Sequence, residues 1–510
     1  MTATSTAERR ILIGLAAFAM VWAIVRAHVQ AITIDEAVTY TNFVRPADPT
    51  FWAAHANNHL LNSMLMWSFA RVFGVSNLVA RSGALIGAAT YITASYFLSV
   101  LIAERFLLRV FLFICLVFNP LVFDFLVAAR GYGLASGFLL GAICFVAYAL
   151  TSGVKTPPVA RACVAASLCI ALSFLGNFSF GIVDAACIAM LYVWASGSST
   201  SPKERLTLAA ACFLPGLLLA GALAGPVLLQ WKQAELNYGA SSLSETFRSL
   251  YQASFYELDP SVRRLVFIDI PSPGILLLAV AVFAAWRASL VLIHGRSPRN
   301  GPGRWSPVFA AVPILAVSAA LLLHWVMFRV MRIPLPQDRT AIYVVVLITL
   351  FLGILAAVPI PTRAGEISRR GMTILIVLLG SYFLLCLRLN YFKEWKWDSD
   401  TDKLYSVLAS YNRACGLMDI ASDWRYDAAL NYYRNASGRE TFPEFPHSDK
   451  LLAGRRAYVL YQPEDAEFLA EHRLNIVYQA PSGAAIALDP QVRSSPGENP
   501  CPATPRERGE

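Results

Sequence analysis

The stretch "AITIDEAVTYTNF" (residues 31–43) follows the first long apolar run of the chain, residues 12–28, and carries Asp35 and Glu36 side by side. Carboxylates at the edge of a membrane are unfavourable unless they end a helix in water or take part in chemistry. A purely structural alternative exists, because Asp35 could cap the N-terminus of a following helix. The remaining sequence has to distinguish a helix cap from a reactive site.

The composition is that of a multi-pass membrane protein. Hydrophobic residues make up 56% of the chain and charged residues 15%, with a mean hydropathy of +0.52. Both values lie outside the range of ordinary soluble domains. Runs of about 17–25 apolar residues can cross a bilayer. They predict an all-α membrane domain of about eleven spans, at 12–28, 78–103, 107–127, 133–150, 160–176, 178–196, 207–229, 272–292, 308–328, 341–360 and 372–389.

Lysine and arginine in the short connections predict the orientation of these spans, since such residues gather on the cytoplasmic side. If about eleven spans alternate, all the basic connections fall on one side, together with the N-terminus. These basic residues are Arg9, Arg10, Arg105, Arg109, Lys155, Arg161, Lys203, Arg205, Arg296, Arg299, Arg304, Arg363, Arg369 and Arg370. The outward-facing segments are then 30–77, 129–132, 230–270, 329–340 and everything after 390. The sequence therefore predicts a protein of the cytoplasmic (inner) membrane with a cytoplasmic N-terminus and an extracytoplasmic C-terminal part.

Three parts follow one another along the chain. Residues 1–390 form the predicted membrane domain, whose first outer loop, 30–77, contains "HLLNSMLMWSFARVFG", read as an interfacial helix. Residues 391–493 read as a small α/β domain: helices at "KLYSVLASYNRACG" and "PEDAEFLAEHR", and strands at "RAYVLYQ", "LNIVYQ" and "AAIALD". Residues 494–510 are rich in Pro, Ser and charge and are expected to be disordered.

Charge and cysteine usage exclude several classes of function. Residues 390–510 hold 14 Lys and Arg against 18 Asp and Glu, so the basic balance of the whole chain arises in the membrane part. No compact basic domain of the kind that binds nucleic acid is present. The nine cysteines show no CxxC pair or metal-ligand spacing. Cys415 and Cys501 lie outside the spans, and whether they pair stays open.

Polar residues gather at the predicted outer boundary of the membrane. Beside Asp35 and Glu36, the sequence places there a histidine, several arginines and two acids within or at the end of spans. An intramembrane acid is a functional candidate by default. Arginines at headgroup depth suit a phosphate, and a nearby carboxylate can accept a proton from a hydroxyl or amine. The further candidates are Asn58, His59, Asp124, Arg130, Tyr132, Asp184, Arg329, Arg332 and Arg339.

Together these features favour glycosyl transfer from a lipid-linked phosphate. A polyprenyl-phosphate sugar needs no nucleotide, which agrees with the absence of a GxGxxG or P-loop sequence. The acceptor could be a protein, a lipid or a glycan, and the sugar is not specified. Surrounding membrane lipids are the other expected contacts, and nucleic acid is not expected.

The order of motifs resembles the GT-C superfamily of membrane glycosyltransferases, in the branch of the protein O-mannosyltransferases and the lipid A aminoarabinose transferase. The similar pieces are "DEA" after the first span, "NNHLLNSMLMWSFARVFGVSNLVARSGAL", "AARGYGLA" with its Arg-x-Tyr pattern, and "PLPQDRTAIYVVVL". They lie within residues 10–390, and "DWRYDAALNYYR" in the tail is a weaker match. In one place the chain departs from the family: an acid often precedes the Arg of Arg-x-Tyr, and here that residue is Ala129.

The resemblance implies an inverting glycosyltransferase with Asp35 as general base toward the acceptor. It implies that Arg130, Tyr132 and Arg339 help to seat the lipid phosphate, and it leaves Glu36, Asn58 and His59 lining the site. Arg81, in the second matching piece, and Arg332 count among the expected substrate-binding residues, while Asp124 is a possible substitute for the acid missing at 129. No cofactor is expected to be required, although a divalent metal stays possible.

Two other classes of function remain open at this point. A transporter or flippase of a lipid-linked or anionic substrate would also contain intramembrane acids and arginines, but it is expected to have broken helices near the membrane midplane. A non-catalytic membrane scaffold would have no need of Asp35 beside Glu36 and a loop histidine. A single cavity holding Asp35, Arg130 and Arg339 would favour the transferase.

Overall fold

The computed structural model describes residues 5–46, 58–151, 159–197, 199, 201–230, 238–255, 273–294, 307–438 and 442–490. The chain divides into two compact units. Unit 1 comprises Met1–Ile24, Trp52–Asn62 and Gly83–Leu387; unit 2 comprises Val25–Phe51, Ser63–Ser82 and Arg388–Glu510. The segment that carries Asp35 thus belongs to the same unit as the C-terminal tail.

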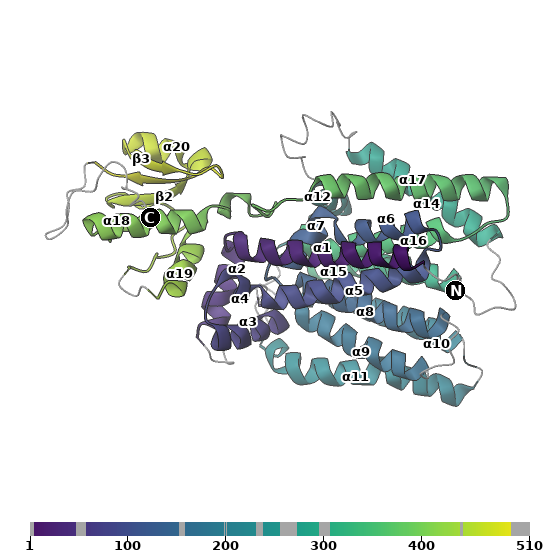
Figure 1. Cartoon of the computed structure of the whole chain (residues 1–510). Coiled ribbons are helices and arrows are strands. Elements are labelled where there is room, and N and C mark those ends of the chain that lie inside the picture. The colour runs from purple at the N-terminus through teal and green to yellow at the C-terminus, as the bar shows by residue number, and fades with distance from the viewer. Residues whose placement is uncertain are drawn as a thin grey trace. The chain divides into compact units, whose positions relative to one another are not determined.

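Unit 1 is built from helices, as the apolar runs predict. Helices α8, α9 and α11 lie side by side, and α16 and α17 pack against α6 (Figure 1). Its helices are α5 (Ser82–Ile102), α6 (Phe106–Val117), α7 (Pro120–Val127), α8 (Tyr132–Thr151), α9 (Val159–Gly176), α10 (Gly181–Gly197), α11 (Pro202–Leu228), α12 (Leu243–Ser254), α14 (Pro273–His294), α15 (Pro307–Met331), α16 (Ile342–Ala357) and α17 (Arg363–Leu385), with the short η3 (Phe178–Phe180) and η5 (Asp338–Ala341) and most of α1 (Thr6–Val29).

The membrane character of the fold agrees with the sequence, and the described residues contain nine or ten candidate spans. Among the described residues, nine helices are long and apolar enough to cross a bilayer, and the bent pair α6–α7 would make a tenth. The predicted span at 272–292 falls on α14, where the described apolar part, Leu278–Ile293, counts among the shorter helices. A total of eleven therefore stays a prediction.

The predicted span 107–127 is broken, with a bend of 57° between α6 and α7. The break lies at Asn119-Pro120. A residue before proline avoids the helical region, and Asn119 is accordingly extended, with ψ of 127°. Its side-chain oxygen then accepts a hydrogen bond from Val122 N at 3.3 Å and caps α7, whose first residue is Pro120. Two adjacent residues thus end one helix and begin the next.

Basic side chains meet acids at one end of unit 1. Arg109 pairs with Glu8 at 3.4 Å and Arg105 with Glu366 at 3.3 Å. These residues belong to connections that the sequence places on the cytoplasmic side. Helix α16, about 24 Å long at 1.5 Å per residue, leads from η5 toward this end. The other end, where η5 lies, carries the polar residues described below.

Unit 2 contains a four-stranded sheet and several helices. The strands β1 (Ile420–Ser422), β2 (Ala457–Tyr461), β3 (Asn475–Gln479) and β4 (Ala484–Leu488) follow the order β1-β2-β4-β3, with β1 parallel to β2 and the other pairs antiparallel. The helices are α2 (Ile34–Thr39), α3 (Leu60–Phe73, shared with unit 1), α4 (Asn77–Ala80), α18 (Thr401–Cys415), α19 (Asp427–Ala436) and α20 (Gln462–Glu471), with the π-helix η1 (Tyr40–Val44) and the short η6 (Lys396–Asp398).

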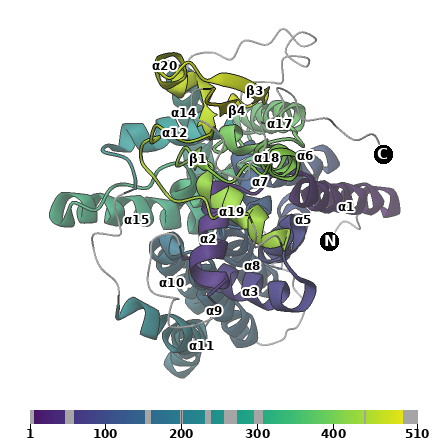
Figure 2. The ribbon, with the colours of Figure 1, turned by 90° about the vertical axis from the view of Figure 1, so that its left-hand side faces the viewer.

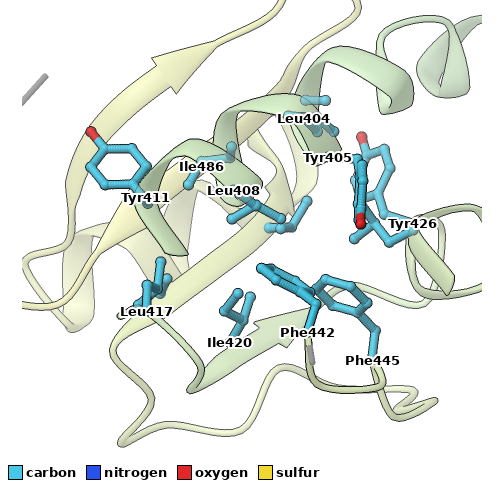
Figure 3. Close-up of a cluster of buried hydrophobic side chains, with 14 of the residues drawn as sticks. Leu404, Tyr405, Leu408, Tyr411, Leu417, Ile420, Tyr426, Phe442, Phe445 and Ile486 are labelled. Carbon is cyan, nitrogen blue, oxygen red and sulfur yellow. The ribbon is translucent and has the colours of Figure 1, made fainter. Parts of the chain in front are cut away.

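The core of this sheet domain is aromatic and aliphatic. Leu404 and Leu408 of α18 pack with Ile420 of β1, Ile486 of β4 and the ring of Phe442 (Figure 3). The five elements predicted in the tail are confirmed as α18, β2, α20, β3 and β4. Two elements of the tail, β1 and α19, were not predicted from the sequence. The helix predicted at 59–74 is confirmed as α3, and its interfacial position stays a prediction. Cys501, whose pairing with Cys415 stays open, and the tail 494–510 lie outside the described residues.

Candidate functional site

The predicted site residues are divided between the two units. Unit 2 holds Asp35, Glu36 and Arg81. Unit 1 holds Asn58, His59, Asp124, Arg130, Tyr132, Asp184, Arg332 and Arg339. The expectation that one cavity holds Asp35 together with the arginines stays a prediction.

Asp35 lies in the first turn of α2 and does not cap it. The cap is Thr33, whose hydroxyl oxygen accepts a hydrogen bond from Glu36 N at 3.3 Å. In return, Glu36 Oε2 accepts one from Thr33 N at 2.9 Å, which completes a capping box. The structural alternative for Asp35 as the N-cap is therefore wrong. Its side chain is half-buried, and its negative charge at the start of the helix is favourable.

Glu36 and Arg81 form a fully buried ion pair. Arg81 Nε donates to Oε1 at 2.9 Å and Nη2 donates to Oε2 at 2.7 Å. The remaining guanidinium N–H groups donate to the carbonyl oxygens of Ala27, Gln30 and Ala31. All five donors of the arginine are thus used within the protein. These contacts give Arg81 and Glu36 a part in fixing the turn before α2. That Arg81 binds substrate and that Glu36 belongs to the catalytic site stay predictions.

Two residues of the tail, which the sequence analysis did not select, bind the same turn. Asp398 Oδ2 accepts a hydrogen bond from Ile34 N at 2.7 Å, and Tyr433 Oη accepts one from Ile32 N at 2.8 Å. Helix α19, which carries Tyr433, packs against α2, and Figure 2 shows the two together. Two features of the sequence could have indicated these residues. Asp398 is an acid soon after the last predicted span, in "WKWDSD", and Tyr433 lies in "DWRYDAALNYYR", the weaker match to the superfamily.

Burial raises the pKa of Asp398 well above its usual range. The nearby charges of Asp35 and Glu36 raise it further, whereas the bond from Ile34 N lowers it. Asp398 and Asp35 are therefore close enough to influence each other's charge. Asp35 directly follows the turn whose backbone is held by the tail and by Arg81.

In unit 1, two arginines lie near a buried histidine. The pKa of His59 is well below its usual range, first because of burial and then because of the positive charges of Arg130 and Arg339. The imidazole is therefore neutral at physiological pH. Its ring centroid lies 5.5 Å from that of Tyr132. Four predicted residues are thus brought together, and this group is called the arginine site below.

The residue after Arg130 has to be glycine, because of its backbone conformation and its close neighbours. Gly131 has φ of +71°, and a Cβ there would lie 2.0 Å from the carbonyl oxygen of Gly176 and 2.9 Å from His59 Cβ. Only glycine fits such a position. Asn62 donates to the carbonyl oxygen of Ala129 at 2.9 Å, on the residue where the family often has an acid. These contacts fix the turn that presents Arg130.

Arg339 is presented by a second connection. Its guanidinium lies over the ring of Tyr238, 4.6 Å from the centroid, and Tyr238 Oη donates to Asp338 Oδ2 at 3.4 Å. Asp338 N in turn donates to Ser249 Oγ at 3.0 Å, and Asp338 has φ of +44°. Burial raises the pKa of Tyr238 to about 12, so its hydroxyl stays protonated and able to donate. Tyr238 and Ser249 lie in a predicted outer loop and were not selected from the sequence.

The remaining predicted residues of unit 1 are Asp184, Asn58, Asp124 and Arg332. Asp184 is buried between α9 and α10 and accepts a hydrogen bond from Ser173 Oγ at 2.8 Å. Asn58 and Asp124 are buried, and Asp124 lies in α7. Arg332 is exposed at the end of α15 and has φ of +59°. In the part of the chain that the structure describes, no group of three or more His, Cys, Asp or Glu could hold a metal ion. Metal independence stays a prediction.

Comparison with known proteins gives structural likenesses. No family model matches the sequence, and no curated protein matches it. The chain is similar to ArnT from Cupriavidus metallidurans bound to undecaprenyl phosphate, with 12% identity over 96% of this chain and 100% of that one and a TM-score of 0.47.

Two further likenesses are to arabinofuranosyltransferase AftD from Mycobacteria and to the oligosaccharyltransferase AglB from Archaeoglobus fulgidus, in complex with an inhibitory peptide and a dolichol-phosphate. AftD has 14% identity over 92% of this chain and 34% of that one, with a TM-score of 0.42. AglB has 13% identity over 84% and 64%, with a TM-score of 0.41. All three are glycosyltransferases of the GT-C superfamily, which the sequence motifs resemble.

Proposed function

We propose that this protein is a membrane glycosyltransferase that moves a sugar from a polyprenyl-phosphate donor to an acceptor at the outer face of the cytoplasmic membrane. The observation that carries the proposal is the arginine site: two guanidinium groups beside a buried, neutral His59 in a unit made of apolar helices. Two arginines close together and beside an uncharged imidazole form a locally positive site, which suits an anionic substrate group. A phosphate on a lipid anchor reaches this depth, and arginine binds phosphate oxygens with two donors at once.

The proposed roles follow from the contacts. Arg130 and Arg339 bind the donor phosphate, and both are presented by backbone that other residues fix: Gly131 for the first, and Tyr238 for the second. His59, being neutral, adds no competing positive charge and can exchange hydrogen bonds with the donor. The membrane supplies the polyprenyl chain with an apolar environment.

Asp35 is the proposed general base. Its carboxylate accepts the proton of an acceptor hydroxyl or amine while that atom bonds to the anomeric carbon. The bond from this carbon to the phosphate oxygen breaks with its electron pair, and the polyprenyl phosphate leaves with the charge that the arginines stabilise. A single displacement inverts the anomeric configuration. The sugar, the polyprenol length and the acceptor type are not specified by these residues.

Replacing Asp35 by Asn tests this role directly. The change keeps shape but removes the basic oxygen, and Thr33 continues to cap α2, so stability should change little. Turnover should fall by roughly 10²–10⁴-fold, the usual contribution of a positioned acid or base. Sugar transfer from a panel of radiolabelled polyprenyl-phosphate sugars and thermal unfolding are measured on one detergent preparation.

Glu36→Gln is the matched control for that experiment. It makes the same acid-to-amide change one residue later, but it disrupts the ion pair with Arg81, and breaking a buried pair costs about 3–5 kcal/mol of stability. We therefore expect Glu36→Gln to lower the melting temperature and Asp35→Asn to lower the rate. Full activity in a stable Asp35→Asn protein would rule out the proposed base.

One observation favours the alternative of a transporter or flippase for a lipid-linked or anionic substrate. The bend between α6 and α7 is a discontinuous helix, a feature that transporters use near their binding sites. Reconstituted vesicles distinguish the two functions. A transferase forms glycosylated acceptor when donor and acceptor are on the same side, whereas a flippase moves donor across the bilayer without forming product.

A further inference from the structure

The amide of Ile34 is the first N–H of α2, and its hydrogen-bond partner comes from the far end of the chain. The first N–H groups of a helix have no partner within the helix. Here Thr33 supplies the cap for Glu36 N, and Asp398, which is 1% exposed, accepts from Ile34 N at 2.7 Å. The position of α2 therefore depends on a side chain 364 residues away.

Asp398 is itself held in place. The hydroxyl of Thr401 donates to its carbonyl oxygen at 2.9 Å and to Oδ1 at 3.4 Å, which leaves Oδ2 directed to Ile34. Tyr433 provides a second attachment two residues earlier, through Ile32 N at 2.8 Å. Two side chains of the tail thus hold two backbone amides of one turn, immediately before Asp35.

Packing supports the same attachment. The ring of Tyr40, which directly follows α2, meets the ring of Tyr432 edge to face, with centroids 5.2 Å apart. Asn77, just before Arg81, donates to the carbonyl oxygen of Gln30 at 3.1 Å. The turn is thus held from the tail on one side and from the α4 segment on the other, so that Asp35 is attached to a fixed piece of backbone.

We propose that Asp398 is a positioning residue for Asp35: by accepting the hydrogen bond of Ile34 N, it holds the first turn of α2 in the orientation in which the Asp35 carboxylate acts. The part concerning catalysis rests on the proposed function. The part concerning the position of α2 does not, and it can be measured separately.

Asp398→Ala, Asp398→Asn and Tyr433→Phe, made in the full-length protein, test the proposal. Asn retains a carbonyl oxygen that can accept from Ile34 N, whereas Ala does not. We expect faster hydrogen–deuterium exchange in peptides covering residues 32–39 for Asp398→Ala, and exchange close to wild type for Asp398→Asn. Sugar transfer should show the same pattern, with kcat lowered roughly 10–100-fold in Asp398→Ala, since a small misplacement of a catalytic group is enough for such a loss.

The tail offers a matched control in Asp465. Its Oδ2 also accepts a backbone amide at 2.7 Å, from Tyr461, but within the sheet domain. Asp465→Ala should leave exchange at 32–39 and sugar transfer unchanged. Tyr433→Phe, which removes the acceptor of Ile32 N, should accelerate the same exchange. It replaces Asp398→Ala as the test variant if Asp398→Ala does not fold.

Three outcomes would overturn the inference. These are unchanged exchange at 32–39 in both Asp398→Ala and Tyr433→Phe, equal damage in Asp398→Asn and Asp398→Ala, or faster exchange with full transfer activity. A different result would reject the proposed function, namely full sugar-transfer activity of Asp35→Asn. A defect in Asp35→Asn without one in Asp398→Ala would reject the positioning role alone.

Discussion

Arg81 and Arg130 are both almost fully buried, yet their surroundings differ. The five donors of Arg81 bind Glu36 and three carbonyl oxygens around one turn of unit 2. Arg130 lies in unit 1 with a second arginine, Arg339, near a neutral histidine. Arg287 resembles Arg81, because it donates to the carbonyl oxygens of Leu355 and Gly365. Burial alone therefore does not identify a binding arginine; Arg130 is distinguished by the second arginine and the histidine near it.

Removing either arginine of the arginine site should weaken donor binding. In Arg130→Ala or Arg339→Ala, a desolvated phosphate loses a charged partner, which costs about 2–5 kcal/mol. The dissociation constant of polyprenyl phosphate in detergent measures this loss. Arg81→Met is the contrasting variant, expected to reduce the amount of folded protein because Glu36 is left buried and unpaired. Unchanged donor affinity in both alanine variants would mean that these arginines have only a structural role.

At the scale of single residues, the sequence identified those that short motifs mark. His59, Arg130, Tyr132 and Arg339 were selected from their motifs and do come together in unit 1. Thr33 was missed as the cap of α2, although Thr33-x-x-Glu36 has the spacing of a capping box.

Other partners were missed for a different reason. Asp398, Tyr433 and Tyr238 act through contacts 100 or more residues apart in sequence, so no local pattern announces them. Only the folded backbone brings each of them beside the residue that it holds.

At the scale of elements, regular periodicity predicted the longer helices and strands of the tail correctly, whereas shorter or irregular elements were missed. The five predicted tail elements formed, whereas β1 has only three residues and α19 mixes aromatic and polar side chains. The Asn119-Pro120 dipeptide marks the break in the predicted span 107–127, because proline restricts the residue before it. Hydropathy alone passes over such a break, since both halves are equally apolar.

The connection between α19 and β2 should respond to pH. His447 Nδ1 lies 2.6 Å from Asp427 Oδ2, and the bond and the negative charge of Asp427 raise the pKa of His447. A histidine with a raised pKa stabilises the folded state below its unfolded pKa of about 6.5, and this contribution is lost as pH rises through the folded pKa. Burial raises the pKa of Asp427, so its own proton uptake also favours the folded state at lower pH.

Thermal unfolding of wild type and His447→Gln across pH 5.5–8.5 measures this effect. We expect the wild type to be the more stable of the two at the acidic end and the difference to disappear at the alkaline end. A difference independent of pH would contradict a charged pair.

At the scale of the whole molecule, the helical membrane fold and the sheet-containing tail were predictable from composition and periodicity. The grouping of Val25–Phe51 and Ser63–Ser82 with the tail in one unit was not, because it depends on long-range contacts such as Tyr40 on Tyr432. Hydropathy alone also does not determine the number of spans. The bent α6–α7 pair can count as one span, and the described apolar part of α14 is one of the shorter helices.

The predicted topology can be tested with cysteines introduced at two exposed positions. Asp449 lies in the tail, where its side chain is 95% exposed, and Lys203 is exposed at the start of α11. A membrane-impermeant thiol reagent should label Asp449→Cys in intact cells and Lys203→Cys only after permeabilisation. The reverse pattern would place the tail in the cytoplasm and remove the basis for an outer-face reaction.

The hydrogen bond between Ile34 and Asp398 has a consequence for how the protein is made. A ribosome adds about 5–20 residues per second, so the 364 residues between the two partners take roughly 20–70 s to synthesise. Throughout that interval α2 is inserted without the tail that holds it. The turn carrying Asp35 is completed only after Asp398 has been synthesised, so on the proposed function a chain that stalls or ends before Asp398 would lack a positioned base and transfer sugar poorly.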